Sequence, residues 1–149
     1  MTSKQIDLII KSWERISHEP QLIQKFYDKL FEIAPETRVY FQGDIAKQSE
    51  KFAYTLGFVA GNIERMDKIK KDIEELGRIH SKLLIKEEEY SYLKEALLIT
   101  IDEALDGGDN TETIQAWDHV LTYISDLMIN VSRGDKNKKK TFFSKIFST

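Results

Sequence analysis

The sequence predicts an all-α protein with one domain, and three observations support this. Its 149 residues include only 7 Gly and 2 Pro, about half the usual share of these turn-forming residues. Apolar residues recur with the helical period through most of the first 131 positions. A chain of this length buries roughly two-thirds of its unfolded surface, which is enough for one apolar core. All-β folds, which need a turn about every ten residues, are excluded.

The first helix is predicted to begin after Thr2, which forms a capping box with Gln5. Its apolar stripe consists of Ile6, Ile9, Ile10, Trp13 and Ile16. Pro20 interrupts the chain, and a second helix follows with Ile23, Phe26, Tyr27, Leu30 and Phe31 on one face. Pro35 cannot continue that helix, but it suits the first turn of a new short helix that reaches Phe41.

Four longer helices are expected after the break at Gly43 and Asp44. They cover about residues 46–63, 67–80, 87–105 and 110–130. Each range carries apolar residues three or four positions apart, such as Ile69, Ile73 and Leu76. The two Gly and two Asp residues at 106–109 form the turn before the last helix.

The charge distribution divides the chain into an acidic domain and a basic tail. Residues 132–149 contain six basic residues and one acid, a net +5, so residues 1–131 carry −8 of the total of −3. An acidic domain disfavours nucleic acid as a partner.

The sequence has no Cys, which excludes disulfides and thiolate metal sites. Neither a signal peptide nor an apolar run of ~18–20 residues is recognisable, so we expect a soluble cytoplasmic protein.

Common catalytic motifs are not present in the sequence. It has no Gly-rich phosphate loop, no GxSxG and no HExxH. The three histidines, His18, His80 and His119, lie far apart, and we interpret His18 and His119 as structural or surface residues. Carboxylates such as those of residues 87–89 are interpreted as a solvated helix surface.

Three polar residues lie on apolar stripes, which is unusual. His80 shares a face with Ile73 and Leu76, Gln48 precedes Phe52 by one turn, and Tyr27 lies within the face of the second helix. Each of them alone is typical of a hydrogen-bonded core residue. Together they suit a cofactor that brings its own metal ligands. Haem iron has four porphyrin nitrogens, needs one axial imidazole and leaves a sixth position for a gas.

The residues resemble those of a bacterial single-domain haem globin. The resemblance covers about residues 3–131, is close to the globin half of flavohaemoglobins and extends to neuroglobin-like single-domain globins. Its most specific stretches are Phe26-Tyr27-Asp28-Lys29-Leu30-Phe31, the segment 35–41, Leu76-Gly77-Arg78-Ile79-His80, and Trp117 in the last helix. It implies the globin fold, a 3-on-3 helical sandwich around haem b (iron protoporphyrin IX).

The resemblance also implies a role for individual residues. His80 would be the proximal iron ligand, and Tyr27 and Gln48 would be distal hydrogen-bond donors. Further residues would form the cofactor site: Phe41 wedged against the porphyrin, Lys51 on a propionate, Leu76, Ile85, Leu93 and Leu97 packed on the ring, and Phe52 in the ligand pocket. Tyr90 matches the Tyr that orients the proximal His in flavohaemoglobins. Two positions differ from the flavohaemoglobin pattern. Gly134 stands where a proximal Glu is expected, and Phe52 replaces an aliphatic residue, which should narrow the pocket.

The function expected from this resemblance is tight, reversible binding of O2, with NO and CO as other ligands. Two alternatives stay open: NO dioxygenation with an external electron-donor reductase, and a haem-based sensor that signals through the tail. The tail, residues 132–149, carries Phe142, Phe143, Ile146 and Phe147 at the spacing of one helical face, among lysines. It is interpreted as a frayed end or a short helix docked on the domain, with contact to a membrane surface or a protein as the alternative.

Overall fold

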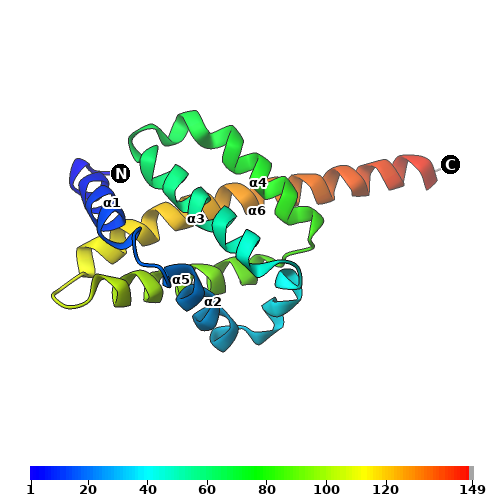
Figure 1. Cartoon of the computed structure of the whole chain (residues 1–149). Coiled ribbons are helices and arrows are strands. Elements are labelled where there is room, and N and C mark those ends of the chain that lie inside the picture. The colour runs from blue at the N-terminus through cyan, green and yellow to red at the C-terminus, as the bar shows by residue number, and fades with distance from the viewer. Residues whose placement is uncertain (148–149) are drawn as a thin grey trace.

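The computed structural model describes the backbone of residues 1–147, and their side chains except at residues 139–143 and 146–147. The predicted all-α class is confirmed. The elements along the chain are α1 (Ser3–Ile16), α2 (Leu22–Ile33), the 3-10 helix η1 (Pro35–Phe41), α3 (Ile45–Gly61), the 3-10 helix η2 (Ile63–Ile69), α4 (Lys70–Lys82), α5 (Glu87–Leu105) and α6 (Thr111–Phe147) (Figure 1). The helix expected over residues 67–80 therefore begins within η2.

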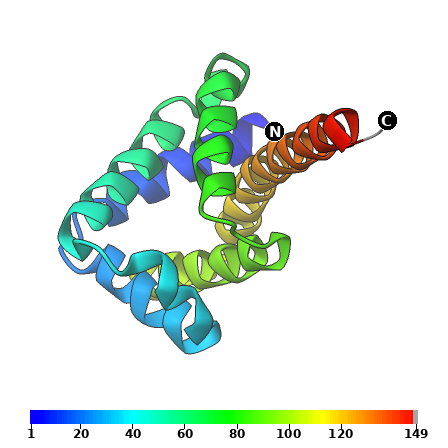
Figure 2. The same cartoon turned by 90° about the vertical axis from the view of Figure 1, so that its right-hand side faces the viewer.

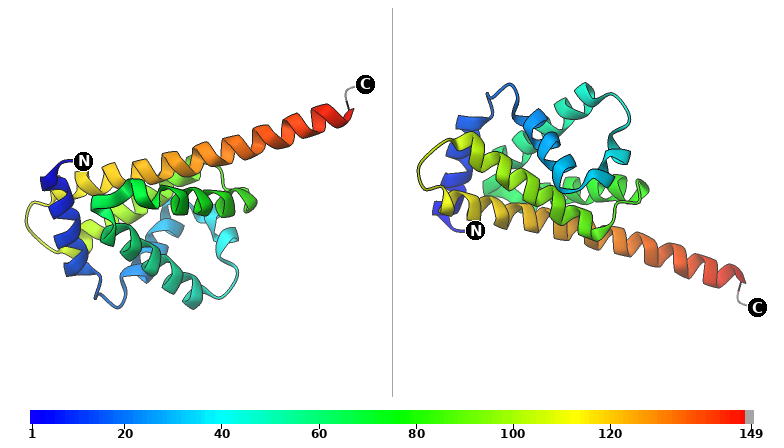
Figure 3. Two further views of the ribbon diagram at one scale, coloured as in Figure 1. Left: turned by 90° about the horizontal axis from the view of Figure 1, so that it is seen from above. Right: turned by 90° about the horizontal axis from the view of Figure 1, so that it is seen from below.

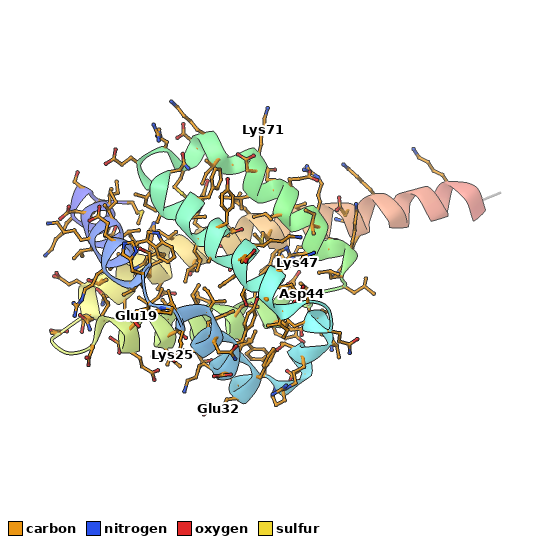
Figure 4. All side chains as sticks on the ribbon, in the orientation of Figure 1. Glu19, Lys25, Glu32, Asp44, Lys47 and Lys71 are labelled. Atoms are coloured by element: carbon orange, nitrogen blue, oxygen red, sulfur yellow. The ribbon has the colours of Figure 1, made fainter. Side chains whose placement is uncertain are left out.

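Helix starts follow the local sequence. The Thr2 side chain accepts a hydrogen bond from the Gln5 amide at 3.1 Å, and the Gln5 side chain accepts one from the Thr2 amide at 3.0 Å. This confirms the predicted capping box of α1. Asp44 caps α3 by accepting from the Lys47 amide at 3.2 Å, and both residues are labelled in Figure 4. The cap fixes the point where the chain turns from η1 into α3.

The helices pack around a core centred on Trp117 of α6. The core joins α1, α2, α3, α5 and α6, and its most buried side chains include Ile9, Ile16, Phe26, Leu30 and Trp117. The indole Nε1 donates to Ser12 Oγ at 2.9 Å, and Ser12 donates to the Ile9 carbonyl at 3.1 Å. A buried indole thus has its polar group satisfied by the facing helix, as buried polar groups require.

A second, smaller apolar cluster holds α4 in place. It contains Ile69, Ile73, Tyr90 and Met128, which come from η2, α4, α5 and α6. In this arrangement α4 lies along α6 (Figures 1 and 3), and α3 and α4 form separate arms of the molecule in Figure 2. The larger cluster thus includes residues of α2 and α3, whereas α4 belongs to the smaller one.

The last helix is longer than predicted. It was expected to end near residue 130, but α6 continues without a break to Phe147 and projects from the rest of the molecule in Figure 3. Ser132 is the last buried residue among those whose side chains are described. None of the helices in residues 1–147 is both long and apolar enough to cross a membrane. Over residues 132–147 the backbone is therefore a continuation of α6 and not a frayed end or a separate docked helix, and the predicted apolar face at Phe142, Phe143, Ile146 and Phe147 lies outside the described side chains.

Candidate functional site

His80 is held in a defined orientation on α4. Its Nδ1 lies 2.7 Å from the carbonyl oxygen of Leu76, one turn earlier in the same helix. A carbonyl can only accept, so Nδ1 carries a proton, and in the neutral form of the ring Nε2 keeps its lone pair. A neutral imidazole whose other nitrogen is fixed by a hydrogen bond is the usual form of a histidine metal ligand. The half-buried His80 is therefore prepared to donate Nε2 to a metal that brings its other ligands with it.

Tyr90 of α5 is the aromatic neighbour of His80. The two ring centroids lie 6.3 Å apart, and the Tyr90 side chain is buried. Burial raises the pKa of the Tyr90 phenol to about 12, so the phenol is neutral at physiological pH. Gly134 stands where the flavohaemoglobin pattern has a proximal Glu. A Cβ added at Gly134 would meet nothing within 4 Å. The acceptor of the His80 proton is thus the Leu76 carbonyl of its own helix.

The position of α4 depends on Gly77. A Cβ on Gly77 would lie 2.9 Å from the Cα of Met128 and 3.3 Å from its carbonyl oxygen. Both contacts are with the backbone of α6, which cannot move aside as a flexible side chain can. Glycine is therefore required where α4 crosses α6, and it lies one turn before His80.

Tyr27 of α2 lies in an aromatic cluster on the other side of the fold. Its side chain is 2% exposed. Its ring centroid lies 5.3 Å from Phe26, 6.0 Å from Phe31, 5.1 Å from Phe41 and 6.4 Å from Phe52. Phe52 stacks on Phe26 at 4.7 Å with an interplanar angle of 12°. The unusual Phe52 therefore fills space beside Tyr27 and helps to fix its ring.

Two distal polar groups are available for a ligand. Burial raises the pKa of the Tyr27 phenol, and a side-chain hydrogen bond with Ser49 offsets part of the rise, so the phenol keeps its proton at neutral pH. The Oε1 atom of Gln48 is buried and has no hydrogen-bond partner among the described residues. An unpartnered buried polar group costs ~1–3 kcal/mol. Because Oε1 can only accept, this atom suits a proton donor, and a negatively polarised ligand would instead be met by the Nε2 amide of Gln48.

Several apolar residues predicted to contact a macrocycle are only partly buried. These are Phe41, Phe52, Leu76, Ile85 and Leu93, whereas Leu97 is 4% exposed. Lys51 is exposed on α3, one turn after Lys47. A bound flat apolar group could cover more of these partly buried side chains. The residue types, an imidazole with an available Nε2 among apolar and aromatic side chains, are those that haem requires.

The predicted residues form two groups. Ring contacts and the larger core bring together Tyr27, Phe41, Phe52, Leu93 and Leu97. The smaller cluster gathers Leu76, Ile85 and Tyr90, with His80 against Tyr90. Gln48 and Lys51 both come from α3, the helix that also carries Phe52. His18 and His119 are exposed, as predicted.

One sequence-based interpretation is wrong, because Glu89 is not a solvated carboxylate. Glu87 and Glu88 are exposed, but Glu89 is 4% exposed and accepts hydrogen bonds from Tyr40 Oη at 2.6 Å and from the Lys86 amide at 2.8 Å. The signal that could have found it is local. Glu89 is the third residue of α5, the position at which a carboxylate reaches back to the N-cap amide. Its partner Tyr40, 49 positions earlier, gives no such signal.

Comparisons with known proteins agree with this geometry. The globin family model matches residues 24–128. The chain is 33% identical over 126 residues to a flavohaemoprotein of Oceanobacillus iheyensis, a match that covers 83% of this chain and 31% of the relative. It is 27% identical to an uncharacterised globin-like protein of Aquifex aeolicus, with 89% and 96% covered. A bacterial globin structure from Campylobacter jejuni superposes with a TM-score of 0.75 at 25% identity, covering 91% of this chain and 99% of that one.

The chain belongs to the globin family, and the predicted globin fold is confirmed. Membership of this family supports haem-based binding of diatomic gases in general. The chain spans about a third of the length of the flavohaemoprotein that it matches, which leaves that protein's full activity as a matter for proposal.

Proposed function

We propose that this globin binds haem b through His80 and holds O2 tightly and reversibly, with NO and CO as other ligands. The observation that carries this proposal is the 2.7 Å contact between His80 Nδ1 and the Leu76 carbonyl, because it leaves Nε2 free. Haem, when bound, supplies an iron atom that takes one protein ligand and leaves one position for a gas. The remaining contributions come from the chain itself.

At this site polar residues hydrogen-bond the gas ligand, and apolar residues pack against the macrocycle. Tyr27 and Gln48 donate hydrogen bonds to a ligand with partial negative charge, and such bonds are stronger where water is excluded. Phe41, Phe52, Leu76, Ile85, Leu93 and Leu97 pack against the macrocycle, and Tyr90 supports the His80 ring. Lys51 is exposed on α3 and can pair with a propionate. A carbon monoxide molecule carries less charge and gains less from the same donors.

Titration of the purified full chain with hemin tests the proposal. We expect a Soret absorption band that saturates at one equivalent of hemin, followed by an O2 complex after reduction. A chain that takes up no hemin would contradict the proposal. Adding NO, O2 and a flavin-dependent reductase to the loaded protein distinguishes a gas-binding protein from an NO dioxygenase. Sustained nitrate formation would favour the dioxygenase, for which the likeness to a flavohaemoprotein is the supporting observation.

We propose in addition that residues 1–131 form the globin domain and that the tail, residues 132–149, contacts an anionic membrane surface. The supporting observation is that α6 stays helical to Phe147 beyond Arg133, whose guanidinium pairs with Glu87 of α5 at 2.6 Å. The Ser132 side chain is 5% exposed, whereas Lys136, Lys138 and Lys145 are exposed. Lysines near an anionic bilayer contribute ~1 kcal/mol each.

Vesicle sedimentation of the full chain checks this second proposal. We expect binding to phosphatidylserine-containing vesicles but not to phosphatidylcholine vesicles at low salt. Replacing Lys138, Lys139 and Lys140 together by Glu should reduce the partition coefficient at least tenfold. The matched control replaces Lys68, Lys70 and Lys71, which are exposed on η2 and α4, by Glu. Equal partitioning of the two triple variants would remove the proposed role of the tail.

A further inference from the structure

Glu89 and Tyr40 connect two segments that each carry a candidate site residue. Tyr40 precedes Phe41 at the end of η1, and Glu89 precedes Tyr90 near the start of α5. The Tyr40 hydroxyl donates to Glu89 Oε1 at 2.6 Å. The bond therefore joins the segment that carries the aromatic contact of Tyr27 to the helix that supports the His80 ring.

The Tyr40 hydroxyl and a backbone amide share one buried acceptor atom. The Glu89 side chain is 4% exposed, and its Oε1 also accepts from the Lys86 amide at 2.8 Å. A carboxylate that accepts two short hydrogen bonds is a charge-assisted acceptor, about twice as strong as a neutral one. The hydrogen bond to Glu89, followed by burial, raises the pKa of the Tyr40 phenol to about 12, so the donor keeps its proton at physiological pH.

Each segment also has contacts of its own: the Phe41 ring lies 5.1 Å from Tyr27, and Glu87 at the start of α5 accepts from Arg133 at 2.6 Å. The end of η1 is followed by the loop 42–44, whose residues are exposed. The connection from α4 to α5 passes through Leu84, which has a φ of 60° and is 76% exposed. A left-handed backbone conformation at a leucine costs ~1–2 kcal/mol, so contacts of the neighbouring segments must compensate this cost. The Tyr40–Glu89 bond joins the element before the first loop to the helix after the second connection.

We infer that Tyr40 and Glu89 form a strap that holds Phe41 and Tyr90 at a fixed separation and so retains the haem in its site. This inference rests on the proposed function, because the strap has a group to retain only if haem binds. Tyr40 and Glu89 are positioning residues that act through Phe41 and Tyr90. Loss of the strap should allow η1 and the start of α5 to separate, which opens an exit for the haem.

The first test measures haem loss from the loaded protein to an excess of a haem-scavenging apoprotein. Tyr40→Phe keeps the ring and removes only the donor, and we expect it to speed haem loss about tenfold, equivalent to ~1.4 kcal/mol. Glu89→Gln keeps an acceptor oxygen without the charge and should give a smaller acceleration. Tyr54→Phe, in a tyrosine that is 76% exposed on α3, is the matched control and should not change the rate. A haem loss rate for Tyr40→Phe equal to that of the wild type would overturn the inference.

The second test uses hydrogen exchange in the apoprotein and separates this inference from the proposed function. We expect the amides of residues 37–44 to exchange faster in Tyr40→Phe than in the wild type or Tyr54→Phe. Unchanged exchange would show that the strap does not hold η1. If the wild type takes up no haem, the proposed function fails, while faster exchange in Tyr40→Phe still supports the strap as a structural link.

Discussion

Replacing Gly77 by alanine is expected to lower the free energy of unfolding by about 1–2 kcal/mol. Alanine favours a helix interior over glycine by ~1 kcal/mol, so local propensity alone predicts the opposite sign. The added methyl group would lie 2.9 Å from the Met128 Cα, and the two backbones must separate to accept it. Overpacking of this kind costs ~1–3 kcal/mol, or more when no side chain can move away. Because the same helix carries His80, we also expect weaker hemin binding.

Gly134→Ala provides the matched control for Gly77→Ala. Gly134 is also a helical residue, but a Cβ there would meet nothing within 4 Å. This substitution should therefore raise the unfolding free energy by about 0.5–1 kcal/mol. Thermal and urea unfolding of both variants and the wild type measure the difference. Equal stabilisation by the two substitutions would show that α4 and α6 do not approach as closely as the Gly77–Met128 contact indicates.

Replacing Tyr27 by phenylalanine is expected to speed O2 dissociation about tenfold or more. The ring is surrounded by phenylalanines and 2% exposed, so the variant should keep its packing and lose only the hydroxyl. A hydrogen bond to a ligand in a dry pocket contributes ~1–1.5 kcal/mol, and 1.4 kcal/mol corresponds to a tenfold change in dissociation. Stopped-flow or flash-photolysis kinetics of the reduced protein measure this rate.

The controls for Tyr27→Phe separate a distal role from a general change in the pocket. The CO dissociation rate should change much less than the O2 rate, because CO accepts weaker hydrogen bonds. Tyr123→Phe, in a tyrosine that is 37% exposed on α6, should leave both rates unchanged. An O2 dissociation rate in Tyr27→Phe equal to that of the wild type would contradict the proposed distal donor.

Most of the fold could be predicted from the sequence because its helices are amphipathic and its caps are local. The Thr2 capping box and α5, expected over residues 87–105, agree with the structure. The end of α6 could not be predicted, because residues 135–141 contain no apolar residue and so interrupt the apolar period of the helix. Its helix continues from the preceding turns of α6.

The candidate site was predictable in its residue types but not in its internal bonds. His80, Gln48 and Tyr27 could be selected because polar residues are unusual on apolar stripes. The Leu76 carbonyl bond to His80 could not be derived, since it depends on the ring orientation. The Tyr40–Glu89 pair was missed for a similar reason: a contact between residues 49 positions apart depends on tertiary packing, and a Glu among three consecutive glutamates resembles a solvated surface.

The central claim is that His80 holds haem iron through Nε2, and the absorption spectrum of the reduced protein tests it most directly. The wild type, His80→Gly and the matched control His119→Gly are each loaded with one equivalent of hemin, with and without added imidazole. We predict that the wild type and His119→Gly share one five- or six-coordinate histidine spectrum. His80→Gly should lose that spectrum or its haem, and added imidazole should restore it by filling the vacated position. A His80→Gly spectrum identical to that of the wild type without imidazole would contradict the claim.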